Sequence, residues 1–354
     1  MALCQRLIGA YRLAEAEATT EQGMWSHSLF RDRQQGLTQA LGRGDPAALA
    51  ELLGSMFRSD FVLGMAHGSL ISEGQSRLKA RLWWLTTLTK LVALAEALGV
   101  ARVENPEQGG VGGALAEGVE DLVVKIEARL GLSLDFPEVG AAYGVMGGVH
   151  LVTPDSPDQV YAAVRLRDAI ETHLPRSDRP VRVVEIGGGY GAMAYWLLAL
   201  VDARYVIVDL PIVNVLHGYF LSQALGAGEV SLFGEGPAKV TIVPDHALSS
   251  VETPFDVLAN KDSLPEIPER EARDYLHWAR SGCAGLLYSY NQEAAAPFYG
   301  TPQIVVSEVL SEMGGFTRAR REASWLRRGW VEEVYIPVAA PRSNQAGSPG
   351  HSLR

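Results

Sequence analysis

Residues 181–191, VRVVEIGGGYG, place a run of apolar and β-branched residues directly before a glycine-rich turn. The run 181–186 has the composition of a strand that is buried on both faces of a parallel sheet. An apolar stretch with the character of a helix follows over 191–200. Glycine tolerates positive φ and lets backbone N–H groups approach a ligand closely. We therefore expect strand, turn and helix, with the turn at the ligand-binding edge of an open α/β sheet.

Strands and helices alternate after this turn, and the last two strands have a different connection. A link of six residues, 324–329, joins them and leaves no room for a crossover helix, so they should pair antiparallel. The predicted fold is α/β: a mostly parallel, Rossmann-like sheet that ends in an antiparallel C-terminal hairpin. The further strands are expected over 204–210, 239–243, 255–260, 285–290, 316–323 and 330–338, and helices over 211–226, 269–280 and 303–313.

The first third of the chain reads as helical. In Arg77–Leu98, Trp84, Leu88, Leu91 and Leu94 recur at spacings of three and four, as one face of a helix requires. Further helices are expected over 115–130 and 158–174. We expect a helical N-terminal domain over 1–175, a sheet domain over 176–340 and a disordered tail over 341–354.

The composition limits the classes of partner. The chain has 354 residues and a formal charge of −10, without the basic face that nucleic-acid binding needs. Its two cysteines make no disulfide framework or zinc site. The N-terminus lacks the pattern of a signal peptide, and no stretch is apolar enough to span a membrane. We expect a cytoplasmic protein with a small-molecule partner, and an apolar face on the N-terminal helices would allow a homodimer.

Two acids flank the glycine turn. Glu185 stands two residues before the first glycine, and Asp209 ends the next strand, 18 residues after Gly191. An acid at that strand end can accept both hydroxyls of a ribose, which suits NAD and S-adenosylmethionine (SAM) equally. The series Gly187-x-Gly189-x-x-Ala192 also fits the dinucleotide fingerprint. Glu185 would repel a pyrophosphate and attract a cationic ligand, so SAM is the expected cofactor and an NAD-dependent oxidoreductase the alternative.

Several motifs make the chain similar to a known family over roughly residues 140–335. It resembles the sugar O-methyltransferases among the class I SAM-dependent methyltransferases. The resemblance implies the class I fold and, within secondary metabolism, methylation of a hydroxyl on a sugar or glycosylated metabolite, with the helical domain covering the acceptor. A nitrogen or carboxyl acceptor, or a non-catalytic assembly role, stays open. The motifs are VEIGGGYG (184–191), VIVDLP (206–211), YFLSQALG (219–226), DSLPEIP (262–268), YSYNQEA (288–294) and SWLRRGWVEEVY (324–335).

The resemblance also implies the residues that hold the cofactor. Glu185 and the glycine turn would hold the amino-acid end of the cofactor, and Asp209 would hold its ribose. The segments that follow the next strands would lie beside the adenine and the methyl group. These residues are Glu185, Gly187, Gly188, Gly189, Tyr190 and Gly191 at the turn, Asp209 for the ribose, Leu210, Asp245 and His246 for the adenine, and Asn260 and Lys261 beside the methyl group.

A hydroxyl acceptor needs a base to take its proton. Asp262, Glu266 and Glu293 follow the fourth and fifth strands of the sheet domain and are candidates, as is His277, which also reads as a helix-surface or core residue. Asp262 could instead only form a turn. A divalent metal could orient an acceptor, but no ligand spacing requires one and none is predicted. Arginines around the hairpin (Arg318, Arg320, Arg321, Arg327, Arg328) read as a solvated strand face, or as a site for an anionic acceptor.

Overall fold

A computed structural model describes residues 1–17, 28–62, 64–66, 77–105, 107, 118–295, 297 and 302–338. The tail predicted over 341–354 lies outside these residues. Among the residues described, no helix is both long and apolar enough to cross a membrane.

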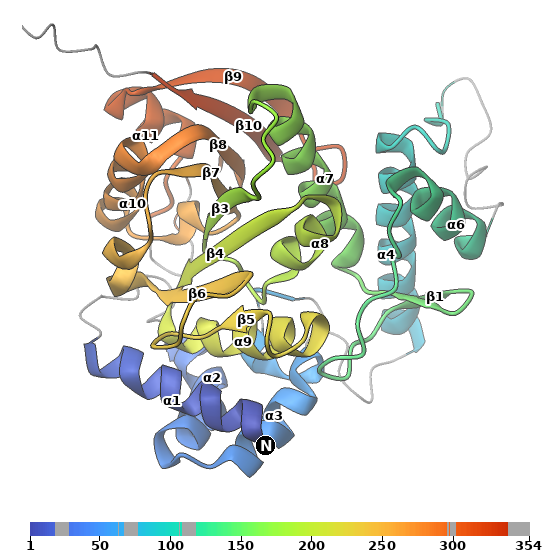
Figure 1. The fold of residues 1–354 in the computed structure, drawn as a ribbon. Helices are drawn as coiled ribbons and strands as arrows, with labels where there is room; N and C mark the ends of the chain where they lie inside the picture. The colour runs from blue at the N-terminus through green and yellow to red at the C-terminus, as the bar shows by residue number, and fades with distance from the viewer. Residues whose placement is uncertain are drawn as a thin grey trace, which may run out of the picture.

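An eight-stranded sheet forms the centre of the molecule (Figure 1). Parallel pairing joins its first six strands, and β10 pairs antiparallel with both β8 and β9. The predicted fold class, a mostly parallel sheet with an antiparallel C-terminal hairpin, is therefore confirmed. In sheet order the strands are β5 (Val230–Ser231), β6 (Val240–Pro244), β4 (Ala203–Asp209), β3 (Val181–Ile186), β7 (Phe255–Lys261), β8 (Cys283–Gln292), β10 (Trp330–Pro337) and β9 (Phe316–Ala323).

Helices cover both faces of this sheet. One face carries α7 (Ser156–His173), α8 (Ala192–Leu200) and α9 (Pro211–Leu225), and the other carries α10 (Glu269–Gly282) and α11 (Val306–Met313) (Figure 1). Each layer encloses its own apolar core, because strands buried on both faces have apolar side chains on each side. Helix α7, which the sequence placed in the N-terminal domain, packs against α8 and β8.

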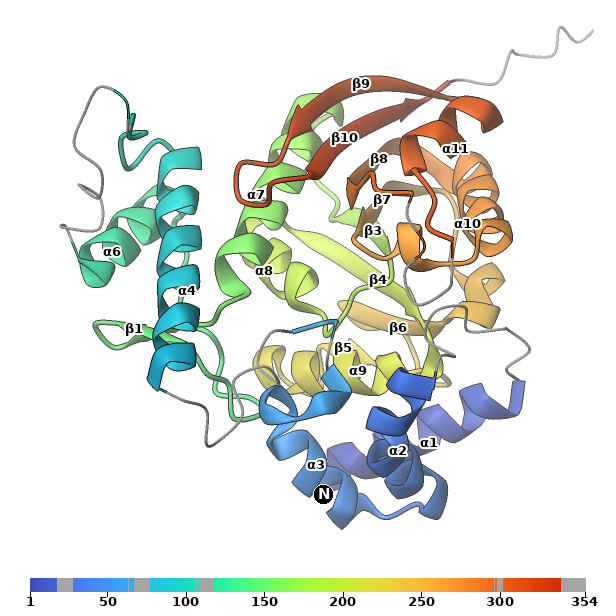
Figure 2. The same ribbon diagram turned by 180° about the vertical axis from the view of Figure 1, so that it is seen from behind.

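The N-terminal residues form two groups of elements. Three helices, α1 (Ala2–Glu17), α2 (Ser28–Arg43) and α3 (Pro46–Gly54), lie together, and α1 packs across α9. A separate lobe holds α4 (Arg77–Ala97), α6 (Val119–Leu130) and a hairpin of β1 (Val145–Gly147) and β2 (His150–Val152), at the left of Figure 2. The hairpin was not predicted, because strands of three residues each are too short to show a strand pattern in the sequence.

The buried stripe of α4 is shorter than its sequence pattern predicts. Leu88, Leu91 and Leu94 are buried, whereas Trp84 is 43% exposed. Helical periodicity shows which residues share a face, but it cannot show where along the helix a neighbour ends.

Candidate functional site

The carboxyl ends of β3, β4 and β7 open onto a cavity of about 310 Å³. The strand order reverses direction beside β3, and ligands in open α/β sheets bind at such a switch point. The volume lies at the lower end of the range for small-molecule sites. The cavity is lined by Gly64, Met65, Ala66, Asp155, Asp158, Gln159, Glu185, Gly187, Gly188, Gly189, Asp209, Val213, Lys261, Asp262, Ser263, Glu266 and Arg327.

The glycine turn forms one wall of the cavity. Gly187 has φ +70°, and a Cβ there would lie 2.1 Å from Ser263 Oγ. A Cβ on Gly188 would lie 3.0 Å from Glu185 Oε2. Only glycine at these positions therefore leaves room for the backbone of the turn beside Ser263 and the Glu185 carboxyl group. The sequence predicts such a close approach of the backbone.

Glu185 reaches the cavity from β3 and is 1% exposed. Tyr205 donates a hydrogen bond from its hydroxyl to Glu185 Oε2 at 3.0 Å. Burial raises the pKa of Glu185 to about 7, against the lowering effects of Tyr205 and Lys261. A carboxyl group so little hydrated is poised to ionise when a cation comes within reach.

Replacing Glu185 with Gln is expected to change how stability depends on pH. The free energy of unfolding of this variant should fall less than that of wild type as the pH rises from 5 to 8. The raised pKa means that the folded state keeps a proton that the unfolded state releases, from its ordinary pKa of 4.5 up to about 7. The free energy of unfolding of the wild type therefore falls as the pH rises through this window. Melting temperatures at both pH values test this, with exposed Glu229→Gln as the control. An unchanged pH dependence in the Glu185 variant would contradict the assignment.

Asp209 lies at the end of β4, between two cavities. Its Oδ1 accepts the backbone N–H of Leu210 at 2.8 Å. Burial raises the pKa of Asp209 to about 8; the Leu210 N–H opposes this, and the nearby carboxyls of Glu185 and Asp245 add to it. Gly187, Asp209, Ser263 and Glu266 line both the large cavity and a neighbouring one of about 50 Å³.

The smaller cavity continues the site beyond Asp209. Leu210 and Asp245, two of the residues expected at the adenine, line it, and Tyr275 contributes a wall from α10. His246 does not line it. Its Nδ1 lies 3.4 Å from Asp245 Oδ1, and its ring meets Phe233 edge-on at 6.1 Å.

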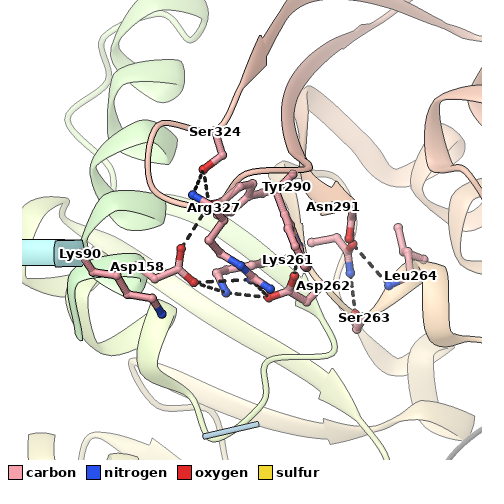
Figure 3. Close-up of polar contacts among 12 residues, drawn as sticks. Lys90, Asp158, Lys261, Asp262, Ser263, Leu264, Tyr290, Asn291, Ser324 and Arg327 are labelled. Atoms are coloured by element: carbon pink, nitrogen blue, oxygen red, sulfur yellow. Dashed lines mark hydrogen bonds and ion pairs between the residues drawn. The ribbon is translucent and has the colours of Figure 1, made fainter. Parts of the chain in front are cut away.

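Opposite the glycine turn, four charged side chains form an ion-pair quartet: Asp158, Lys261, Asp262 and Arg327 (Figure 3). Lys261 Nζ lies 2.8 Å from Asp262 Oδ2 and 3.3 Å from Asp158 Oδ2. Arg327 donates to Asp262 at 2.6 Å and lies 3.5 Å from Asp158. The quartet joins α7, the end of β7 and the β9–β10 loop, three segments far apart in sequence.

The quartet fixes the protonation state of Asp262. Burial alone would raise its pKa, but Lys261 and Arg327 hold it at about 2. Trp330 also donates to its Oδ1 at 2.5 Å, and these contacts maintain a backbone φ of +70°. Asp262 is therefore an anion with engaged oxygens, which is a poor proton acceptor.

Glu266 has the opposite environment. It follows β7 in the short helical turn η6 (Leu264–Glu266) and lines both cavities. Among the residues described, its carboxyl group has no hydrogen bond or ion pair. Burial, helped by the charge of Asp262 and opposed by Arg327, raises the pKa of Glu266 to about 7. This is the value that a base needs at neutral pH.

Besides His246, three further predicted cofactor residues lie beside the two cavities without lining them. Tyr190 turns its ring into the core, edge-on to Phe57 and Phe220. Gly191 caps α8. Asn260 is fully buried and donates to the Ile186 carbonyl at 2.8 Å, so it ties β7 to the turn after β3.

Two of the predicted bases lie elsewhere. Glu293 is held by Arg321 on β9 at 2.7 and 2.8 Å, which lowers the pKa of Glu293, and it does not line the cavity. His277 is exposed on α10. Of the four candidates, Asp262 and Glu266 reach the cavity.

Sequence reasoning missed the wall opposite the sheet. Gly64–Ala66 come from the N-terminal region, and Asp155, Asp158 and Gln159 from the start of α7. An acid in the first turn of a helix normally reads as a favourable partner of the helix dipole, which hid Asp158. In the described part of the chain, no group of three His, Cys, Asp or Glu side chains is arranged to hold a metal ion.

No protein-family model matches the chain, and no curated protein matches its sequence. Among solved structures, an O-methyltransferase family protein from Burkholderia thailandensis is similar at 13% identity and a TM-score of 0.40, covering 92% of this chain and 95% of that one. Magnesium protoporphyrin IX methyltransferase from Synechocystis PCC 6803, solved with SAM, gives 16% identity, a TM-score of 0.36, and coverage of 51% and 79%.

The N-terminal domain of EvdMO1, crystallised in the presence of S-adenosylhomocysteine (SAH) and D-fucose, gives 13% identity, a TM-score of 0.37, and coverage of 56% and 89%. Two of these three proteins are methyltransferases by name or family, the third was crystallised with SAH, and all three sequences differ greatly from this one. The activity of this chain is therefore argued from its own site residues.

Proposed function

We propose that this protein is a SAM-dependent methyltransferase that methylates a hydroxyl group of a sugar or glycosylated small molecule. The observation that carries the proposal is the placement of Glu185, which is buried, and Asp209, whose side chain is 13% exposed, on neighbouring strand ends along two adjoining cavities.

The residues present fit an elongated ligand with a cationic end. Glu185 and the glycine turn would hold the ammonium and carboxylate of the amino-acid end, because the turn offers backbone N–H groups beside an acid. Asp209 would accept the ribose hydroxyls, and the smaller cavity at Leu210, Asp245 and Tyr275 would take the adenine.

The charge of the cavity opposes a dinucleotide. Of the described residues that line the larger cavity, six carry carboxyl groups and two are cationic. Both cations already pair with Asp158 and Asp262. A pyrophosphate would bring further negative charge to an acidic lining, whereas a sulfonium with an ammonium group would favour the ionised form of these carboxyl groups. This favours SAM over NAD.

When bound, SAM supplies a methyl group that its positive sulfur activates. The chain then has to align the acceptor oxygen and remove its proton, and alignment supplies much of the rate. Glu266, which has a raised pKa and no partner among the described residues, would accept the hydroxyl proton, while Asp262 holds Lys261 and Arg327 in place. A nitrogen acceptor has less need of a base with this pKa, so Glu266 supports a hydroxyl acceptor.

The acceptor side supports a polar, uncharged molecule. Asp155, Asp158 and Gln159 face the cavity from α7, and such side chains suit hydrogen bonds to a polyol. Of the hairpin arginines, Arg318 and Arg321 pair with Glu333, and Arg327 belongs to the quartet. Arg318, Arg320, Arg321 and Arg328 do not line the larger cavity, and the one hairpin arginine that does, Arg327, is paired, which opposes the alternative of an anionic acceptor.

Calorimetric titration with SAH tests the donor site. We expect wild type to bind SAH, NADH to give no heat, and Asp209→Ala to bind roughly 100-fold more weakly, because hydrogen bonds to a charged group are lost. The control is Asp202→Ala, an exposed acid at the other end of the same strand region. Absence of SAH binding to wild type would refute the proposal.

A further inference from the structure

A histidine lies directly beneath the proposed donor site and takes no part in the proposed chemistry. His217, in the middle of α9, is 0% exposed. Its Nε2 lies 3.2 Å from Asp209 Oδ2. A Cβ on Gly188 would lie 3.2 Å from its Cε1, so the ring also supports the glycine turn from below.

The ring is neutral and poorly satisfied. Burial lowers the pKa of His217 to about 3, so that one ring nitrogen carries a hydrogen and the other does not. Within the described part of the chain neither nitrogen has a hydrogen bond of good geometry, although Nε2 is within hydrogen-bonding distance of Asp209. Leaving buried polar atoms in this state costs stability, so an apolar residue of similar size would pack better here.

We propose that His217 is a positioning residue for donor binding: a small rotation of its ring when the ribose binds lets Nε2–H donate to Asp209 Oδ2, 3.2 Å away, and so fixes the rotation of that carboxylate. The Leu210 N–H holds Oδ1 at 2.8 Å and the Gly188 N–H also bonds this carboxyl group, so His217 would add a further donor from beneath. The remaining lone pairs then face the cavity and meet the two ribose hydroxyls. This inference rests on the proposed function, since it needs a ribose at Asp209.

Two variants separate the hydrogen bond from the packing. His217→Leu keeps the volume and removes the donor, whereas His217→Gln places an amide N–H near the position of Nε2. We expect His217→Leu to bind SAH about 10- to 100-fold more weakly than wild type, and His217→Gln to recover most of this loss. His173→Leu, at the far end of α7, is the control and should bind like wild type.

A second ligand distinguishes positioning from a structural role. The 2′,3′-dideoxy analogue of SAH lacks the hydroxyls that Asp209 would accept, so wild type and His217→Leu should bind it with equal affinity. The melting temperature of His217→Leu without ligand should equal or exceed that of wild type, because an unsatisfied buried group has been removed.

The outcomes are distinct. If wild type does not bind SAH, the proposed function fails and this inference fails with it. If wild type binds and His217→Leu weakens SAH and the dideoxy analogue by the same factor, His217 only supports the fold and the positioning role is wrong. If His217→Leu does not fold, His217→Gln provides the test. The proposal is overturned if His217→Gln binds SAH no more tightly than it binds the dideoxy analogue.

Discussion

Replacing Glu266 with Gln is expected to lower kcat by roughly 10²–10⁴-fold, the usual contribution of a well-placed base. The Glu266 carboxyl group lies where the two cavities join and has no partner among the described residues. Glutamine keeps the shape of this side chain without its basicity. SAH affinity should stay near that of wild type, because the donor is held by other residues. The measurement is steady-state turnover with a sugar acceptor found by screening, with exposed Glu269→Gln as the control.

The pH profile distinguishes Glu266 from Asp262. Glu266 acts in its ionised form, and its pKa is raised to about 7, so kcat/KM for the acceptor should rise as the pH increases through 7. Saturating SAM keeps the ionisation of Glu185 and Asp209 out of this measurement. A base with the pKa of Asp262, about 2, would give no such limb between pH 5 and pH 8. If the limb persists in Glu266→Gln, the proton is taken by another group.

Replacing Gly187 with Ala is expected to lower the free energy of unfolding by about 2–5 kcal/mol and to abolish SAH binding. The backbone has φ +70°, and the added Cβ would lie 2.1 Å from Ser263 Oγ. Ser263 cannot move aside easily, since its hydroxyl donates to the Ile186 carbonyl at 2.7 Å and accepts from Asn260 at 2.6 Å. Urea denaturation and calorimetry with SAH measure the two effects.

Gly131→Ala is the matched control for this change. Gly131 has the same φ of +70°, but a Cβ there meets nothing within 4 Å. Its substitution should cost about 1–2 kcal/mol, the penalty of the backbone conformation alone. Equal losses in the two variants would mean that close packing at Ser263 does not fix the turn.

The sequence predicted the part of the site that lies within one strand–turn–helix unit and at the ends of its neighbours. Glu185, the glycines and Asp209 could be placed because strand periodicity and glycine chemistry are local. The same reasoning failed to show where side chains point. Tyr190 follows Gly189 in the turn, yet its ring packs on Phe57, a residue more than 130 positions earlier.

The far wall of the cavity could not be predicted because it depends on tertiary packing. Asp158 and Arg327 become site residues only when α7 and the β9–β10 loop meet at Asp262. Glu293 shows the converse. It follows β8 as a site residue might be expected to, but its pairing with Arg321 turns it toward β9.

The ion-pair quartet also bears on how the protein is made. Arg327 belongs to the hairpin near the C-terminal end of the chain, whereas Asp158 lies before the sheet begins. During synthesis the first strands and their glycine turn can form while the buried positive charge of Lys261 still lacks its full set of neighbours. The cavity acquires its last wall only after the β9–β10 loop has left the ribosome, so a nascent or C-terminally truncated chain would have an open, mismatched site.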